Sequence, residues 1–300
     1  MSELHLRLPA TSANLGPGFD TLALALTLYL HIDACLSTQL SIEASGRNAD
    51  ICGATENNVL VETYRSILAA EKRELVPLEL KVRNEIPLGM GCGSSAAVRL
   101  AGVALASHFG GLGWSRDRIL GEASQLEGHP DNVAACWLGG FVASAWRGNQ
   151  VLAVSIPPPP EWRAIIVVPD RPLATATSRA ALPATYSSSD VVANLQSVAL
   201  LTAAFATGRA NLIATAMRDW VHQPYRAEAC PLLPRLLPLA GKDGIAGVAL
   251  SGAGPAVLLL AESPEAAHKA RDRAALELSG VEEVEFLTCE LAAECASLEG

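Results

Sequence analysis

Two spacings of apolar residues separate strands from helices in the first half of the chain. Apolar and polar residues alternate over Leu4–Leu8 and Leu78–Val82, which predicts half-buried strands, and the apolar, β-branched stretch Thr21–Asp33 predicts a third. Ser94–Phe109 is apolar on nearly every side and predicts a buried helix, whereas Arg116–Glu127 has the pattern of a second, more polar helix. The first half therefore interleaves strands with helices.

The second half repeats a different order. Its predicted elements are strand Trp162–Val168, a helix over 190–207, strands Ile245–Leu250 and Ala256–Ala261, helix Pro264–Leu278 and strand Val281–Leu287. This β-α-β-β-α-β order is that of a ferredoxin-like domain. The proline run Pro157–Pro160 forms neither a helix nor a central strand and predicts the linker. The sequence thus predicts an α+β protein with domains over 1–156 and 161–300.

A glycine-rich segment lies directly before the buried helix. Gly89, Gly91 and Gly93 occupy alternate positions, and Ser94 follows them. Glycine lets a backbone turn tightly and approach a ligand, and the free N–H groups of a first helical turn attract an anion. The segment predicts a phosphate-binding loop, although an ordinary glycine turn before a capped helix has the same composition.

Two common phosphate loops do not fit this segment. A P-loop requires Lys directly after its last glycine, whereas Ser94 follows Gly93 here. The dinucleotide fingerprint requires G-x-G-x-x-G directly after a strand, whereas the spacing is G-x-G-x-G and Pro87 separates the loop from the strand. The loop alone leaves the class of phosphate ligand open.

Composition narrows the choice of partners. The chain has 300 residues, half of them apolar, and a net charge of −9 without a long basic run. We therefore expect no nucleic-acid partner. The N-terminus lacks a basic-then-apolar leader, so we also expect no membrane partner. Seven cysteines without a C-x-x-C pair are typical of reduced thiols in a cytoplasmic protein and indicate neither a disulfide framework nor a zinc site.

Four segments resemble the signatures of one superfamily of small-molecule kinases. They are Pro9–Asp20 (PATSANLGPGFD), Pro87–Ala97 (PLGMGCGSSAA), Glu127–Val133 (EGHPDNV) and Leu250–Val257 (LSGAGPAV), in this order. Each resembles a segment of the galactokinase, homoserine kinase, mevalonate kinase and phosphomevalonate kinase superfamily. Cys92 departs from the usual form of the second segment. The first segment has the form that homoserine kinases carry, so that family is the best match.

The resemblance implies a fold and a reaction. It implies an N-terminal ribosomal-protein-S5-like α/β domain that binds ATP, followed by the C-terminal ferredoxin-like domain. The implied reaction transfers the γ-phosphoryl group of ATP to the hydroxyl of L-homoserine and uses Mg²⁺. It is a step of threonine biosynthesis, and the implied compartment is the cytoplasm. The resemblance leaves a homodimer open.

The resemblance also assigns residues to the nucleotide. The implied ATP and phosphate contacts are Pro87, Leu88, Gly89, Met90, Gly91, Cys92, Gly93, Ser94, Ser95, Ala96, Ala97, Gly252 and Gly254. The implied Mg²⁺ ligands are Ser95 and Glu122, since a hydroxyl and a carboxylate are a suitable pair of hard oxygens. A solvated surface glutamate is the alternative for Glu122.

Substrate and catalytic residues are implied in the same way. Asn14, Asp20, His129, Arg179 and Arg226 would orient homoserine, with the two arginines at positions where homoserine kinases hold the amino-acid carboxylate. A guanidinium suits a carboxylate by its planar fork, although single arginines are more often surface charges. Asp131 and Asn132 are the candidate catalytic residues, and the identity of a catalytic base is left open.

Two other functions remain as alternatives. A kinase of the same superfamily that acts on another small alcohol, mevalonate-like or shikimate-like, would keep the glycine loop without needing both arginines. A non-catalytic ligand-binding relative would keep the fold while losing the metal ligands or the serine pair, and Ser94, Ser95 and Glu122 are all present.

Overall fold

The computed structural model describes residues 3–173, 175–280 and 283–299. The elements are β1 (Glu3–Asn14), β2 (Gly18–Leu36), β3 (Ser41–Gly46), α1 (Ala49–Cys52), α2 (Val59–Ala70), β4 (Leu78–Asn84), α3 (Ser94–Phe109), α4 (Arg116–Glu127), α5 (Asp131–Leu138), β5 (Phe141–Arg147), β6 (Gln150–Ile156), β7 (Arg163–Pro169), α6 (Thr175–Ala180), α7 (Ser188–Thr207), α8 (Ala210–Ala216), α9 (Gln223–Arg226), η1 (Ala227–Ala229), α10 (Leu232–Leu236), η2 (Leu237–Leu239), β8 (Gly247–Leu250), β9 (Val257–Ala261), α11 (Pro264–Glu277), β10 (Val284–Glu290) and β11 (Ser297–Glu299).

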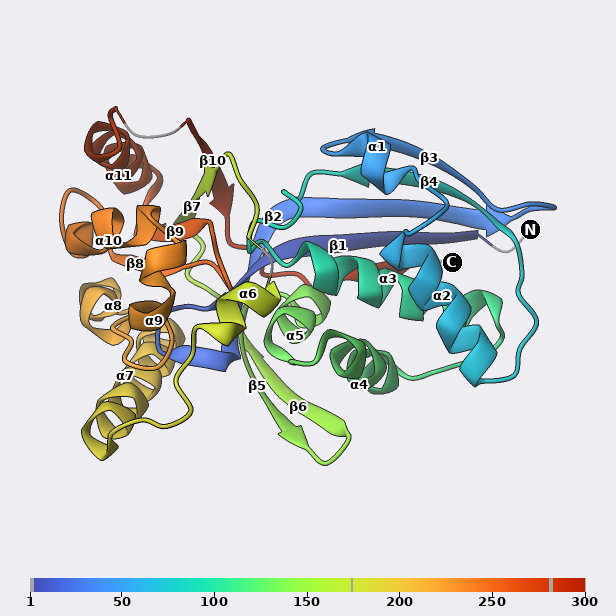
Figure 1. Ribbon diagram of the computed structural model, residues 1–300, viewed down its shortest axis with the longest axis horizontal. Coiled ribbons are helices and arrows are strands. Elements are labelled where there is room, and N and C mark those ends of the chain that lie inside the picture. Colours follow the sequence, from blue (N-terminus) through green and yellow to red (C-terminus); the bar gives the residue numbers. More distant parts are fainter. Residues whose placement is uncertain (1–2, 174, 281–282, 300) are drawn as a thin grey trace.

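The first domain is built on a long pair of antiparallel strands, β1 and β2. Their pairing runs from Glu3 opposite Cys35 to Asn14 opposite Gly18, so both strands extend beyond the predicted segments into the loop between them. The sheet has the order β11-β1-β2-β4-β3, with β5 paired to β2 and β6 to β5. Helices α2 to α5 lie along one side of this sheet (Figure 1). The predicted bounds of α3 and α4 are confirmed to the residue.

The second domain has a four-stranded antiparallel sheet with the order β10-β7-β9-β8. If the strands of this domain are numbered 1 to 4 in chain order, from β7 to β10, the order in the sheet is 4-1-3-2. Helix α7 follows the first of these strands and α11 follows the third. The predicted ferredoxin-like domain is confirmed. The last strand runs from Val284 to Glu290, later than predicted, and residues 281 and 282 lie outside the described residues.

The C-terminal segment does not stay with the second domain. Leu291 forms a bridge with Leu26, the Ala292 N–H donates to Ala25, and β11 pairs with β1. The predicted division into 1–156 and 161–300 therefore needs a correction, because residues 291–299 complete the first sheet. A strand of three residues is too short for a periodic pattern to reveal.

Helix α7 bears on the expected absence of a membrane partner. Residues 191–208 carry no charged side chain, and α7 is long and apolar enough to span a membrane by length and composition. Such a feature in a single helix is weak evidence, because core helices have the same composition. The buried side of α7, which includes Leu201, Ala204 and Phe205, explains part of its apolar character.

The described cysteines are free thiols. Cys92, Cys136, Cys230 and Cys289 are buried, whereas Cys295 is exposed. Burial raises the pKa of Cys92 to about 12, so this thiol stays protonated at neutral pH.

Three aromatic rings join the two domains. Phe205 of α7 stacks on Phe141 of β5 with 4.2 Å between ring centroids and meets Trp162 edge-on at 5.1 Å. Phe205 is 1% exposed, so the contact is a shared core rather than a surface patch. These rings fix α7, and with it the start of the second domain, against the first sheet.

We predict that Phe205→Ala lowers the free energy of unfolding by about 3 to 5 kcal/mol, because it removes a buried ring between two others. Leu195→Ala on the same helix is the control, since Leu195 is 63% exposed, and it should change stability by less than about 0.5 kcal/mol. Urea unfolding measures both. Equal losses for the two variants would show that the rings do not join the domains.

Candidate active site

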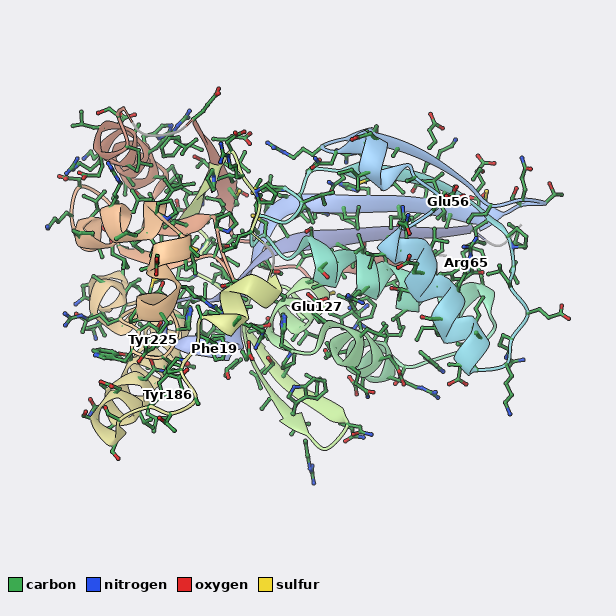
Figure 2. The ribbon with its side chains drawn as sticks, viewed as in Figure 1. Phe19, Glu56, Arg65, Glu127, Tyr186 and Tyr225 are labelled. Carbon is green, nitrogen blue, oxygen red and sulfur yellow. The ribbon has the colours of Figure 1, made fainter. Side chains whose placement is uncertain are left out.

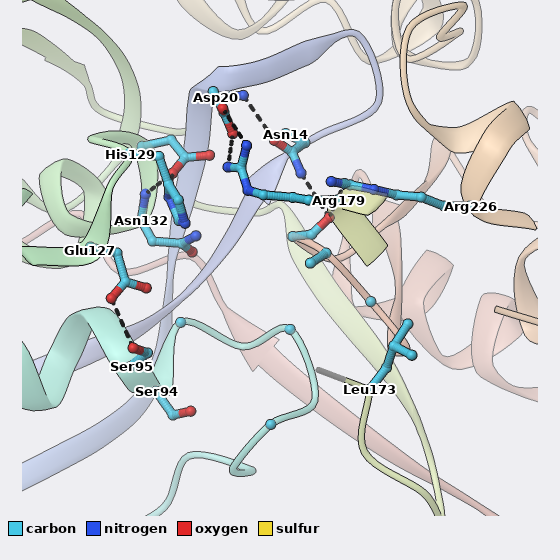
Figure 3. Close-up of a pocket in the computed structure, with 17 residues that line it drawn as sticks. Asn14, Asp20, Ser94, Ser95, Glu127, His129, Asn132, Leu173, Arg179 and Arg226 are labelled. Atoms are coloured by element: carbon cyan, nitrogen blue, oxygen red, sulfur yellow. Dashed lines mark hydrogen bonds and ion pairs between the residues drawn. The ribbon is translucent and has the colours of Figure 1, made fainter. Parts of the chain in front are cut away.

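A cleft lies where the two domains meet. Figure 2 shows Glu127 of the first domain and Phe19 at the start of β2 towards this junction, whereas Glu56 and Arg65 lie far out on the first domain. The cleft is lined by Asn14, Asp20, Gly89, Gly91, Gly93, Ser94, Ser95, Glu127, His129, Asp131, Asn132, Leu173, Arg179, Arg226, Gly252, Ala253 and Gly254, most of them shown in Figure 3.

One wall of the cleft is the glycine-rich loop before α3. Gly89, Gly91 and Gly93 all have positive φ angles, and α3 begins at Ser94 directly after Gly93. A Cβ atom on Gly91 would lie 2.1 Å from the Ser251 carbonyl oxygen, and one on Gly93 would lie 1.9 Å from Thr11 Oγ1. Only glycine fits both positions. The loop therefore presents backbone N–H groups and the start of a buried helix to the cleft, as an anion site requires.

Not every residue assigned to this loop faces the cleft. Cys92, Ala96 and Ala97 are buried and pack in the core. Pro87, Leu88 and Met90 line a separate cavity together with Arg47 and Asn48. Among the loop residues, those that line the cleft are the three glycines, Ser94 and Ser95.

The turn between β8 and β9 closes the cleft from the second domain. Ser251 Oγ lies 2.8 Å from the Gly91 carbonyl oxygen and 2.9 Å from Ser12 Oγ. The Gly252 N–H donates to the Ala13 carbonyl over 3.1 Å, and the Gly252 carbonyl accepts from Asn14 Nδ2 over 2.7 Å. The turn is thus hydrogen-bonded to both the glycine loop and the end of β1. Gly252 and Gly254 line the cleft beside them.

The carboxylate next to Ser95 is Glu127, not Glu122. Ser95 Oγ donates to Glu127 Oε2 over 2.8 Å, and Arg99 Nε lies 2.7 Å from the same oxygen. Glu122 instead lies 3.9 Å from Arg118 Nε on the outer part of α4 and does not line the cleft. The predicted pairing of Ser95 with Glu122 is therefore replaced by Ser95 with Glu127, the last residue of α4.

The turn between α4 and α5 places three polar side chains together. His129 Nδ1 lies 2.7 Å from Asp131 Oδ1, which also accepts the Asn132 N–H over 2.7 Å. Burial lowers the pKa of His129, but the hydrogen bond to Asp131 and its charge more than offset this, so the pKa lies above its ordinary value. Because the Asp131 carboxylate is engaged by both neighbours, it orients His129 and Asn132.

The end of β1 and the start of β2 carry the next polar groups in a strained backbone. Asn14, Leu15 and Asp20 have positive φ angles of 68°, 48° and 53°. Asn14 Oδ1 accepts the Asp20 N–H over 3.0 Å, and Arg179 Nη1 and Nη2 donate to the two Asp20 carboxylate oxygens over 3.0 and 2.6 Å. This paired hydrogen bond raises the pKa of Arg179. Arg179 therefore lies at the cleft with its positive charge balanced by the Asp20 carboxylate.

Arg226 is the unmatched cation of the site. Its side chain is 1% exposed, and it donates to the Ser178 carbonyl over 3.3 Å, to His222 Nδ1 over 3.2 Å and to the Gly252 carbonyl over 3.4 Å. Within the described part of the chain no carboxylate lies within ion-pair distance of it. Burial, and then the charge of Arg179, lower the pKa of Arg226, although a guanidinium stays charged in proteins.

A support for Arg226 was not foreseen from the sequence. His222 Nε2 lies 2.7 Å from the Gly16 carbonyl and therefore donates to it, which leaves Nδ1 as the acceptor for Arg226. Asp219 accepts the N–H groups of Val221, His222 and Gln223 and so fixes the start of α9. Burial lowers the pKa of His222 and keeps the ring neutral, as this acceptor role needs.

Sequence reasoning also missed Glu127, Leu173, Ala253 and Thr11. Glu127 lies two residues before His129, in the segment Glu127–Val133, and this position was the signal that could have pointed to it. Leu173 lies in a loop and Ala253 in a turn, and both line the cleft. Neither side chain has a reactive or charged group that would mark it in the sequence. Thr11 lies on β1, behind Asn132.

The cleft offers two separate places for anionic groups. The glycine loop and the start of α3 lie on one side of the cleft, and the Arg226 guanidinium lies on the other (Figure 3). The polar groups of Asn14, Asp20, His129 and Asn132 line the space between these two places. Such a cleft can hold a phosphate donor beside an acceptor that carries a carboxylate.

Comparison with known proteins gives consistent relatives. Residues 58–140 match the N-terminal domain of GHMP kinases, and residues 201–279 match their C-terminal domain. The homoserine kinase of Solibacter usitatus is 49% identical over 262 residues, which are 87% of this chain and 86% of that protein. The homoserine kinase of Schizosaccharomyces pombe is 36% identical and covers 87% of this chain and 88% of its own.

Solved structures agree with these relatives. The crystal structure of homoserine kinase from Cytophaga hutchinsonii matches with a TM-score of 0.84 and 26% identity over 100% of this chain and 98% of that one. L. major mevalonate kinase, solved with R-mevalonate, matches with a TM-score of 0.69 at 15% identity over 96% of each chain, which shows a shared fold.

We predict that Gly91→Ala weakens nucleotide binding at least about tenfold, because the new Cβ would displace the turn at Ser251 from the glycine loop. Gly111→Ala is the matched control. It also has a positive φ angle but nothing within 4 Å of the new atom, so it should cost about 1 to 2 kcal/mol of stability and leave nucleotide affinity unchanged. Calorimetric titration and thermal unfolding measure the two effects. Equal affinities for both variants would contradict the close approach at Gly91.

Proposed function

Because this chain belongs to the homoserine kinases of the GHMP kinase family, we propose that it transfers the γ-phosphoryl group of ATP to the side-chain hydroxyl of L-homoserine. The products are O-phospho-L-homoserine and ADP, a step of threonine biosynthesis. The observation that carries the choice of substrate is the buried Arg226 cation, which faces the cleft opposite the glycine loop without a carboxylate partner among the described residues. The proposed compartment is the cytoplasm.

Homoserine would be held by its two charged groups. Its carboxylate fits the planar fork of Arg226, which is desolvated and held in place by Ser178, His222 and Gly252. Its ammonium group fits the side of the cleft where the Asp20 carboxylate lies. Asn14 and Arg179 hold Asp20 in this position. These contacts would leave the side-chain hydroxyl free to point towards the glycine loop.

The triphosphate would lie along the glycine loop. The backbone at Gly91 and Gly93 and the first turn of α3, with Ser94 and Ser95, supply N–H and hydroxyl donors. Gly252 and Gly254 approach the same space from the second domain. The nucleotide would therefore bridge both domains, and its affinity would depend on how firmly the turn at Ser251 holds them together.

A divalent cation is proposed at Ser95 and Glu127. The hydroxyl and carboxylate oxygens lie 2.8 Å apart beside the glycine loop, and hard oxygen donors of this kind suit Mg²⁺. When bound, Mg²⁺ would neutralise charge on the phosphates. Arg99 lies beside both side chains and holds Glu127 at the start of α3.

Phosphoryl transfer needs positioning and charge neutralisation more than covalent chemistry from the protein. Asn132 lines the cleft and its amide oxygen is bound by Thr11, which leaves the amide N–H groups to meet the acceptor. Asp131 is already engaged by His129 and by the Asn132 N–H, so its proposed role is to orient both. The proposal assigns no side chain as a catalytic base.

ADP release tests the function directly. Purified protein with ATP and Mg²⁺ is assayed with L-homoserine, with mevalonate, with shikimate and with no acceptor. The proposal expects ADP formation that depends on homoserine, and ³¹P NMR should identify the phosphate ester. Equal or faster turnover with mevalonate or shikimate would support a kinase for another small alcohol. ATP binding without turnover on any of them would support a non-catalytic relative.

Arg226→Ala is expected to raise the homoserine KM by a factor that corresponds to about 2 to 5 kcal/mol, because it leaves the substrate carboxylate unpaired. The ATP KM should change little. Arg226→Lys should restore part of the affinity, since an ammonium keeps the charge but lacks the fork. Arg235→Ala, an exposed arginine of the same domain, is the control and should change neither constant.

The same series needs a substrate without the carboxylate. A simple amino alcohol should be a poor substrate for the native protein and should lose little further in Arg226→Ala. If that amino alcohol suffers the same penalty as homoserine, Arg226 does not bind the carboxylate. Thermal unfolding of each variant separates this result from misfolding.

Glu127→Gln is expected to reduce Mg²⁺-dependent turnover by at least about a hundredfold, because it removes a proposed charged ligand while keeping its shape. Glu122→Gln is the matched control on the same helix and should retain near-native turnover, since Glu122 lies beside Arg118 outside the cleft. Initial rates across a Mg²⁺ titration measure both. A larger loss in Glu122→Gln would restore the assignment made from sequence.

A further inference from the structure

Thr11 lies behind the cleft and touches two parts of the site at once. Its side chain is 0% exposed, and it is not one of the residues that line the cleft. Its hydroxyl donates to Asn132 Oδ1 over 2.7 Å, and its backbone N–H donates to the Cys92 carbonyl of the glycine loop over 3.0 Å. One residue of β1 therefore bonds both the proposed phosphate loop and the side chain that faces the acceptor.

In this structure the Thr11 hydroxyl holds the Asn132 carboxamide by donating to its oxygen. Among the described residues, no other hydrogen bond reaches that carboxamide. A carboxamide has an acceptor end and a donor end, and rotation of χ2 by half a turn exchanges them. With Oδ1 bound by Thr11, the Nδ2 donor is left for the cleft. Without this bond both orientations would be open.

The close packing around Gly93 makes this geometry tight. A Cβ atom on Gly93 would lie 1.9 Å from Thr11 Oγ1 and 3.2 Å from Asn132 Oδ1. The hydroxyl, the amide oxygen and the backbone of the glycine loop thus share one small buried space. Movement of Thr11 would shift Asn132 relative to the loop that binds the phosphates.

We propose that Thr11 is a positioning residue for phosphoryl transfer, which acts through Asn132 by fixing its amide donor towards the acceptor hydroxyl at a set distance from the glycine loop. This inference rests on the proposed function, because Asn132 is assigned there to the acceptor. It adds a residue that touches neither substrate nor nucleotide. Its effect should fall on the chemical step more than on binding, because it sets alignment in the bound complex.

Substitutions at Thr11 separate the hydroxyl from the packing. Thr11→Val keeps the shape and removes the donor, and we expect kcat to fall about tenfold to a hundredfold while both KM values stay within about twofold. Thr11→Ser keeps the hydroxyl and should retain kcat within about threefold. Thr11→Cys offers a weak donor of similar size to serine, so its kcat should lie between those of Ser and Val. Thermal unfolding is recorded for each variant.

A double-mutant cycle tests whether Thr11 acts through Asn132. In an Asn132→Ala background, Thr11→Val should change kcat by less than about twofold, because the group it positions is gone. The same fold-loss in both backgrounds would overturn the inference and assign Thr11 to general packing. If Thr11→Val does not fold, the Ser and Cys variants decide, and equal kcat values for them would also overturn it.

Product formation by the native protein distinguishes a failure of the role of Thr11 from a failure of the proposed function. If the native protein forms O-phospho-L-homoserine and the cycle is additive, the role of Thr11 fails and the proposed function stands. If the native protein forms no product from homoserine, both fail.

Discussion

The site depends on the close approach of three backbone segments that come from different parts of the chain. The turn at Ser251–Gly254 meets the glycine loop at Gly91 and the end of β1 at Ala13 and Asn14 through hydrogen bonds of 2.7 to 3.1 Å. The approach at Gly91 requires glycine, because a Cβ atom there would lie 2.1 Å from the Ser251 carbonyl oxygen. The domains are thereby held so that the glycine loop of one and Arg226 of the other line the same cleft. A cleft built at such a junction can bind two ligands side by side, as a kinase must.

Charge is distributed unequally around this cleft. Arg179 is neutralised by Asp20 within the protein, whereas Arg226 is surrounded by carbonyl groups and a neutral histidine. A buried cation without its own anion is costly unless a ligand supplies one. Burial favours the neutral form of His222. A neutral His222 can accept a hydrogen bond from Arg226 but does not balance its positive charge. The two arginines to which the resemblance gave one role therefore differ: Arg179 is paired with a carboxylate of the protein, whereas Arg226 has no carboxylate partner among the described residues.

Local patterns predicted the helices and the second sheet well because those elements are long and periodic. The caps at Ser115 and Gly128 set the bounds of α4, and the β-α-β-β-α-β order of the second half gave its topology. Such local patterns do not predict contacts between segments that are distant in the sequence. The return of residues 291–299 to the first sheet and the bond from Thr11 to Asn132, 121 positions away, leave no local signal. Glu122 and Glu127 lie on the same helix, and the packing of α4 against α3, which local patterns do not reveal, decides which carboxylate reaches Ser95.

The most direct test is a crystal structure of this protein with L-homoserine, Mg²⁺ and a non-hydrolysable ATP analogue. The account predicts that the homoserine carboxylate lies within about 3 Å of the Arg226 guanidinium, that the metal ion contacts Ser95 and Glu127, and that the acceptor hydroxyl lies within hydrogen-bond distance of Asn132 Nδ2. Homoserine bound with its carboxylate away from Arg226, or phosphates bound away from the loop at Gly91 and Gly93, would contradict it.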